Sequence, residues 1–84
     1  MENAKLLLID DDVDFRTSIR TLLQSHNYKV VEAASGKQGL EMVKTEKPDL
    51  IVLDIMLPGI DGLSVLRRIR LKDDRIPILI LSAQ

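Results

Sequence analysis

Two short, uninterrupted aliphatic runs, each followed at once by aspartate, constrain the fold of this chain more than any other feature. Leu6–Ile9 precedes the acidic triplet Asp10–Asp12, and Leu50–Leu53 precedes Asp54. Runs this short and continuous are typical of strands buried on both faces of a parallel sheet. Because the carboxyl ends of parallel strands share one edge, the sequence predicts that these carboxylates meet. Packed carboxylates repel and raise one another's pKa, so such a cluster indicates water, hydrogen-bond donors or a cation nearby.

Strands and helices alternate along the whole chain. Apolar runs bounded by turn residues predict four strands with a helix in each interval, at residues 5–9, 28–32, 49–53 and 76–81. Such alternation favours right-handed crossovers and a parallel sheet, so the predicted fold class is α/β. The second strand is mixed in polarity, which suits an edge and gives the strand order 2-1-3-4. The crevice where this order reverses direction would hold Asp10, Asp11 and Asp54.

Capping and breaking residues delimit the three predicted helices. Asp12 or Asp14 is predicted to cap the first helix, whose apolar stripe is Phe15, Ile19, Leu22 and Leu23, with Arg16 and Arg20 outside it. Ser35 is predicted to cap the second helix, which runs to Lys47 because Pro48 stops it. The third helix is predicted to pack through Leu63, Leu66 and Ile69. Its basic residues are interpreted as a solvated face, and these are Arg67, Arg68, Arg70 and Lys72.

Composition narrows the class of protein. With 84 residues the chain is predicted to be one domain, residues 1–84, and 12 Lys+Arg against 13 Asp+Glu give no reason to expect nucleic-acid binding by this segment. The absence of cysteine excludes disulfides and thiolate metal sites. No apolar run approaches the roughly 20 residues that cross a bilayer, and the N-terminus lacks the layout of a signal peptide. A cytoplasmic protein without membrane contact is therefore expected.

The last predicted strand, residues 76–81, does not suit the end of a finished domain. It is the most apolar strand of the chain, yet it would lie at an edge of the sheet. The expectation is that the sheet is incomplete beyond this strand. An exposed apolar edge also predicts self-association through residues 76–81.

Three segments together resemble the receiver domain of two-component response regulators. They are Leu7–Asp12, Leu53–Gly62 and Leu79–Ala83, in the order and at the spacing of that family. The resemblance covers all 84 residues and implies a flavodoxin-like, doubly wound parallel sheet. Relative to the family, the chain looks truncated after the fourth strand and lacks the last helix, strand and helix.

The resemblance also implies a role for each matching residue. Asp54 would accept a phosphoryl group from a phosphohistidine of a sensor histidine kinase. Asp11, Asp54 and the backbone carbonyl of Met56 would bind Mg²⁺, with Asp10 acting through a water molecule. Ser82 would donate a hydrogen bond to a phosphoryl oxygen and so link phosphorylation to shape. The module would be no enzyme beyond its own phosphorylation and dephosphorylation, and an output domain in a full-length protein would be the part that binds DNA.

One family residue has no match in this sequence. Receivers carry a lysine at the end of their fifth strand, which donates a charge-assisted hydrogen bond to the phosphoryl group. Lys72, predicted to lie in the loop after the third helix, precedes the fourth strand and is no substitute. The alternative function is therefore a truncated receiver that self-associates and has impaired or no phosphotransfer.

A purely structural interpretation is also considered for these residues. Asp12 and Asp14 are interpreted as acids of a helix N-terminus, and His26 as a surface residue with no metal or catalytic role. Asp10 and Asp11 alone would be an ordinary solvated strand end, and Ser82 alone an ordinary strand-end hydroxyl. A third hypothesis is a Mg²⁺-dependent hydrolase with an aspartyl nucleophile. It is disfavoured because such enzymes place the nucleophile after their first strand and need a cap and a further lysine.

Overall fold

A four-stranded parallel sheet forms the centre of the computed structural model, which describes residues 3–81. Its strands are β1 (Lys5–Ile9), β2 (Lys29–Ala33), β3 (Leu50–Asp54) and β4 (Ile78–Leu81). They lie in the order β2-β1-β3-β4, and each of the three neighbouring pairs is parallel. The predicted α/β class and strand order are confirmed.

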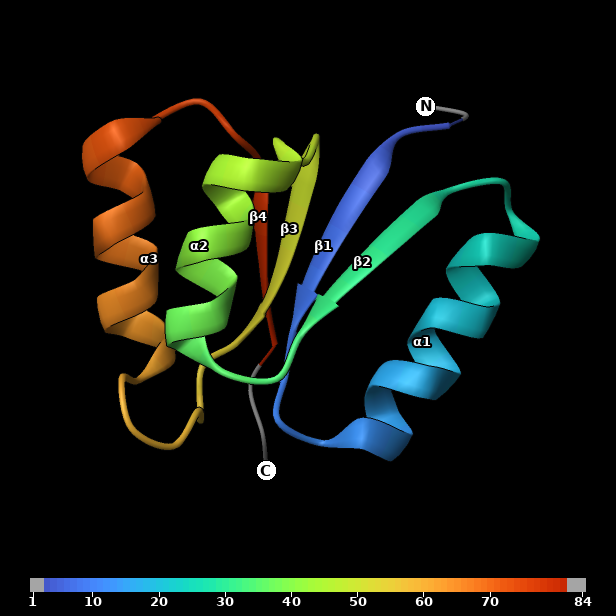
Figure 1. Ribbon diagram of the computed structural model, residues 1–84, viewed down its shortest axis with the longest axis horizontal. Helices are drawn as coiled ribbons and strands as arrows, with labels where there is room; N and C mark the ends of the chain where they lie inside the picture. The colour runs from blue at the N-terminus through green and yellow to red at the C-terminus, as the bar shows by residue number, and fades with distance from the viewer. Residues whose placement is uncertain (1–2, 82–84) are drawn as a thin grey trace.

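Three helices cover the two faces of the sheet. They are α1 (Val13–Ser25), α2 (Gly36–Glu46) and α3 (Gly62–Lys72). Figure 1 shows α1 on one side of the sheet and α2 and α3 together on the other. Side chains alternate between the faces of a strand, so each central strand contributes to both layers. The larger core lies under α2 and α3, and its buried members are Leu7, Ile9, Ala33, Ile51, Leu53, Leu57, Val65, Ile69 and Ile76.

Each helix begins at a side chain that accepts hydrogen bonds from free backbone N–H groups. Asp12 accepts from the N–H groups of Asp14 and Phe15, at 3.0 and 3.2 Å. Ser35 accepts from the N–H of Gln38 at 3.2 Å. These caps satisfy donors that the first helical turn leaves free. The predictions of Asp12 and Ser35 as caps are confirmed, and Asp61 caps α3 in the same way.

The predicted faces of two helices need correction. Leu22 is 56% exposed and Leu63 is 44% exposed, although both were assigned to apolar stripes. The buried face of α3 is instead set by Val65 and Ile69. Val65 and Ile69 are four residues apart and share one face of α3, whereas Leu63 is two residues before Val65 and so lies about 200° round the helix axis.

The strand bounds also differ slightly from the prediction. β2 and β3 each lie one residue later than predicted, so Asp54 is the last residue of β3 and does not follow it. β4 begins at Ile78, because Ile76 is buried ahead of the strand and Pro77 lacks the N–H that a ladder needs. In β4, Leu79 and Ile80 are 56% and 41% exposed, which confirms the predicted apolar edge.

Across residues 3–81, no helix has the length and apolar character needed to cross a membrane.

Candidate metal and phosphoacceptor site

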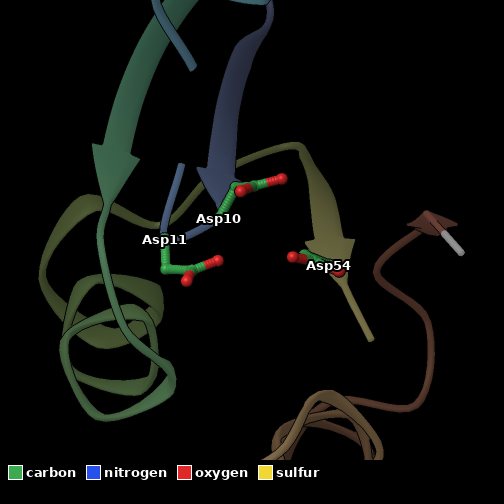
Figure 2. A group of neighbouring side chains, drawn as sticks. All are labelled: Asp10, Asp11 and Asp54. Carbon is green, nitrogen blue, oxygen red and sulfur yellow. The ribbon is translucent and has the colours of Figure 1, made fainter. Parts of the chain in front are cut away.

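The carboxyl ends of β1 and β3 bring three acidic side chains to one rim of the sheet. Ile9 is paired in register with Leu53, so the residues that follow, Asp10 and Asp54, are neighbours. Asp11 comes from the loop after β1. Each of the three carboxylates offers an oxygen within 4.8 Å of the others. Figure 2 shows Asp10, Asp11 and Asp54 converging on one space between the two strand ends, as the sequence predicts.

Asp10 is held in a fixed position and is almost completely buried. It is 6% exposed, and its Oδ1 accepts a hydrogen bond from the N–H of Asp12 at 2.8 Å. Its own N–H donates to the carbonyl of Ala33 on β2 at 3.1 Å. Burial raises the pKa of Asp10, and the nearby charges of Asp54, Asp11 and Asp12 raise it further, while the bond from Asp12 lowers it in part. Asp10 is therefore a carboxylate whose surroundings favour a cation.

Asp54 is the last residue of β3 and is also nearly buried. It is 8% exposed, and its Oδ1 accepts a hydrogen bond from the N–H of Met56 at 2.9 Å. Met56 is 65% exposed, and the part of this residue that contacts Asp54 is its backbone N–H. The N–H of Ile55 donates to the carbonyl of Leu81 at 3.1 Å, which ties the segment after Asp54 to β4.

Gly62 allows α3 to start directly against this segment. A Cβ at position 62 would collide with the carbonyl oxygen of Asp54 and with the Cα of Ile55. The N–H of Gly62 donates to the carbonyl of Ile55 at 3.2 Å. The loop between β3 and α3 is thus fixed at both ends, and only glycine permits the close backbone contact.

Arg16 is a structural partner of the site that the sequence prediction placed outside the packed surface. Its Nη1 donates to the carbonyl oxygen of Asp10 at 2.6 Å, and its Nε donates to Glu32 at 3.1 Å. Arg20, one turn further along α1, donates to Glu32 at 2.5 Å. The only signal in the sequence was the spacing of four between two arginines, with a lone glutamate on the mixed strand.

The remaining predicted residues fall into three groups. Asp14 and His26 are exposed, as predicted, and lie outside the cluster. Lys72 is the last residue of α3 and not part of a loop, so that expectation was wrong. Because α3 runs back along the sheet, its last turn lies at the edge opposite the acidic rim. Ser82 lies outside the described residues.

The donor set fits a hard divalent cation. Two oxygens on opposite sides of one Mg²⁺ are about 4 Å apart, close to the spread of these carboxylates. Within residues 3–81, no lysine or arginine forms an ion pair with Asp10, Asp11 or Asp54. Two nearly buried carboxylates without a cationic partner are costly, and a bound cation removes that cost.

Comparison with known families agrees with this geometry. The family model of the response regulator receiver domain matches residues 6–84. This chain belongs to that family. The receiver is 51% identical over 79 residues to the transcriptional regulatory protein AfsQ1 of Streptomyces coelicolor, a match that covers 94% of this chain and 35% of AfsQ1. It is 36% identical over 83 residues to sporulation initiation phosphotransferase F of Bacillus subtilis, covering 99% of this chain and 67% of that protein.

Solved structures show the same fold. The receiver domain of the Francisella response regulator 1452 superposes with a TM-score of 0.91 at 36% identity, covering 96% of this chain and 67% of that one. The BeF3-activated N-terminal receiver domain of Klebsiella pneumoniae RstA gives a TM-score of 0.88 at 38% identity, covering 95% and 68%. The receiver therefore spans about a third of AfsQ1 and about two thirds of these receiver structures. Receiver domains bind Mg²⁺ at an acidic pocket, and this chain has such a pocket.

Proposed function

We propose that residues 1–84 form a single phosphoacceptor module, in which Asp54 takes a phosphoryl group from a sensor histidine kinase in the presence of Mg²⁺. The observation that carries this proposal is the convergence of Asp10, Asp11 and Asp54 at the rim of the sheet. Receiver domains as a family are phosphorylated by such kinases. We do not assign the chain a separate enzymatic activity, because its chemistry is the modification of its own side chain.

In the proposed reaction, an Oδ of Asp54 attacks the phosphorus of the phosphohistidine. The new P–O bond forms as the P–N bond breaks, and the imidazole leaves with the bonding electron pair and takes up a proton. Such a transfer depends on in-line positioning and on neutralising charge. The hydrogen bond from the N–H of Met56 fixes the rotation of the Asp54 carboxylate. Mg²⁺, when bound, would supply positive charge that neutralises the charge developing in the transfer.

Each acidic residue has its own part in this proposal. Asp11 and Asp54 would bind the ion directly, together with the backbone carbonyl of Met56, and Asp10 would bind it through water. Asp10 is held in place by hydrogen bonds at both its backbone and its side chain. Ser82 is proposed to donate a hydrogen bond to a phosphoryl oxygen once Asp54 is modified.

Incubation with acetyl phosphate and Mg²⁺ tests this function. We expect intact-mass spectrometry to show the addition of one phosphoryl group to the folded chain. The addition should be lost when EDTA removes the metal and in the variant Asp54→Asn, which keeps the shape of the side chain. Asp14→Asn is the matched control, because Asp14 is an exposed acid outside the cluster. A folded chain that shows no metal-dependent addition at Asp54 would contradict the proposal.

A second candidate function is self-association through β4, the alternative that the sequence raised. It is favoured by the exposure of Leu79 and Ile80, 56% and 41%, on a strand at the edge of the described sheet. Exposed apolar edges pair readily with other strands. Sedimentation should then show a dimer or larger species that Leu79→Lys dissociates, whereas Leu22→Lys, at an equally exposed leucine on α1, should not. Asp54→Ala should leave assembly unchanged, and a stable monomer would exclude this function.

A further inference from the structure

A basic groove lies between α2 and α3, on the outer surface of the layer that they form. The two helices are side by side on one face of the sheet (Figure 1). Two hollows open along them, of about 610 and about 310 Å³. They share Leu40, Lys44 and Arg68, so they adjoin each other along the two helices. We call the two hollows together the α2–α3 groove and define it by six lining residues, Lys37, Leu40, Lys44, Arg68, Leu71 and Lys72.

The groove is positively charged although the chain as a whole is not. Its lining includes four cations, Lys37, Lys44, Arg68 and Lys72, against two acids, Glu41 and Asp73. The formal net charge of the chain is −1. Within residues 3–81, none of the four cations is engaged in an ion pair. By contrast, Arg70 on the same helix donates to the carbonyl of Ile76 at 2.6 Å, so it is a structural residue. The predicted solvated face of α3 is therefore corrected only at Arg70, since Arg67, Arg68 and Lys72 are exposed as predicted.

Two of the cations, Lys44 and Lys72, lie close together across the groove. Lys44 on α2 and Lys72 on α3 are neighbours, and the contact with Lys44 and its like charge lower the pKa of Lys72. A like charge this close disfavours the ionised form of Lys72. An anionic group placed between them would convert repulsion into attraction, so the groove gains most from a negatively charged occupant.

The floor of the groove is apolar. Leu40 and Val43 from α2 are half-buried, and Ile69 from α3 is buried. At the end of α3, Leu71 is 86% exposed and also lines the depression. A free inorganic anion would neutralise the cations but leave this apolar surface in contact with water. The occupant that satisfies both parts of the groove has an apolar side and acidic groups beside it.

The spacing of the cations indicates the shape of that occupant. Lys37 and Lys44 are seven residues apart, so they lie on one face of α2 and about 10 Å apart along its axis. Arg68 and Lys72 are four residues apart on one face of α3. A helix with apolar residues on one stripe and acidic residues repeated every four or seven positions beside it matches this pattern.

We propose that the α2–α3 groove is a docking site for an acidic amphipathic helix of a partner protein. The apolar stripe of that helix packs on Leu40, Val43 and Leu71, and its carboxylates meet Lys44, Arg68 and Lys72. A membrane surface fits less well, because Leu40 and Val43 are half-buried between the helices and Leu71 is the one strongly exposed apolar side chain of the groove. The site is separate from the acidic rim, because neither hollow is lined by Asp10, Asp11 or Asp54.

Binding of designed peptides to the whole chain tests the proposal. The probe is a fluorescent, helix-forming peptide of about four turns, with leucine on one stripe and glutamate at every fourth position beside it. A second peptide carries glutamine in place of every glutamate. We expect saturable binding of the glutamate peptide, measured by fluorescence anisotropy, and binding at least about tenfold weaker for the glutamine peptide. Affinity for the glutamate peptide should fall as salt concentration rises.

Variants that reverse the charge of groove residues test whether the peptide binds in the α2–α3 groove. The double variant Lys44→Glu with Arg68→Glu should weaken binding of the glutamate peptide by about tenfold or more. The matched control is Lys29→Glu with Arg75→Glu, which makes the same change in net charge at exposed residues that line neither hollow. Circular dichroism melts should show that both double variants are folded, and binding by the control should equal that of the unaltered chain.

Several outcomes would overturn the proposal. They are the absence of saturable binding, equal binding of the two peptides, and equal loss in both double variants. Vesicles of phosphatidylserine and inorganic tripolyphosphate are the remaining probes. If the groove variant loses binding to vesicles or to tripolyphosphate while the glutamate peptide does not bind, the groove is a site for a membrane or for a free anion, and the partner-helix proposal is wrong.

Discussion

Single residues at the rim of the sheet combine two opposing requirements. Asp10 and Asp54 are almost buried, which opposes their charge, yet their positions are fixed by hydrogen bonds from the backbone N–H groups of Asp12 and Met56. Such bonds favour the ionised carboxylate and offset part of the desolvation. The rim therefore holds two nearly buried carboxyl groups with no lysine or arginine ion-pair partner within residues 3–81.

The raised pKa of Asp10 makes the stability of the metal-free protein depend on pH. The folded protein holds the Asp10 proton more tightly than the unfolded chain, since burial and neighbouring charges raise the folded pKa above 3.8. Stability contributed by this group is therefore lost as pH rises from the ordinary aspartate pKa through the raised value. Asp10→Asn removes the buried charge but keeps the acceptor for the Asp12 N–H. It should therefore stabilise the metal-free chain at neutral pH by about 1 kcal/mol.

Urea unfolding in EDTA between about pH 4 and pH 7 measures this effect. The free energy of unfolding of the unaltered chain should fall across the titration of Asp10, and that of Asp10→Asn should fall less. Asp14→Asn removes the same charge at an exposed position of the first helical turn and should give no gain. A lower stability of Asp10→Asn at neutral pH would show that like-charge repulsion is not the dominant effect at this position.

At the scale of elements, the site depends on how closely α3 approaches the end of β3. The helix starts at Gly62, whose missing side chain lets the backbone lie against the carbonyl of Asp54 and the Cα of Ile55. Backbone atoms cannot move aside as the end of a flexible side chain can. The position of Asp54 and the start of α3 are therefore fixed by the same contact.

Gly62→Ala should destabilise the protein by about 3 kcal/mol, because the added Cβ has no space beside that backbone. Gly59→Ala is the matched control in the same loop. Gly59 has a φ of 73°, and a Cβ there would meet nothing within 4 Å, so the cost should be only about 1 kcal/mol. Urea unfolding of the two variants checks the difference. Equal losses in the free energy of unfolding would mean that the loop moves to make space for the Cβ. The contact at Gly62 would then not fix the loop.

The sequence predicts the existence of elements better than their faces. Continuous aliphatic runs identified β1 and β3, and the mixed polarity of β2 identified an edge. The faces of α1 and α3 were less predictable, since Leu22 and Leu63 fit an apolar period yet are exposed. Periodicity records which residues share a face, but the start of a helix and its distance from the sheet decide which face is buried. The α2–α3 groove was not predictable, because it combines residues of two helices whose adjacency only the fold supplies.

Across the whole molecule, the acidic site was predictable because it follows from topology. Once β1 and β3 are neighbours and parallel, Asp10, Asp11 and Asp54 must lie at one rim. The contact of Arg16 with the carbonyl of Asp10 was not predictable, because it requires the position of α1 over β2. Binding of an ion at a rim that exists only in the folded chain should stabilise the fold as a whole.

Mg²⁺ should accordingly raise the melting temperature of the chain. At a concentration one hundred times its dissociation constant, a ligand that binds only the folded state stabilises it by about 2.7 kcal/mol. Thermal melts with increasing MgCl₂ at constant ionic strength measure this. Asp11→Asn and Asp54→Asn should abolish most of the rise, and Asp14→Asn should leave it intact. A melting temperature that does not respond to Mg²⁺ would argue against a metal site.

The uneven covering of the sheet has a consequence for how the molecule opens. Within residues 3–81, α1 is the one helix on its face of the sheet and has no fully buried residue. The helices α2 and α3 share the opposite face and together bury five residues, three of them glycines. An element with so little buried surface unfolds locally at low cost, so the amides of α1 should exchange with deuterium before those of its two counterparts. Asp12 caps that helix and also donates to Asp10. Transient detachment of α1 therefore loosens the loop carrying Asp11 while the sheet stays intact.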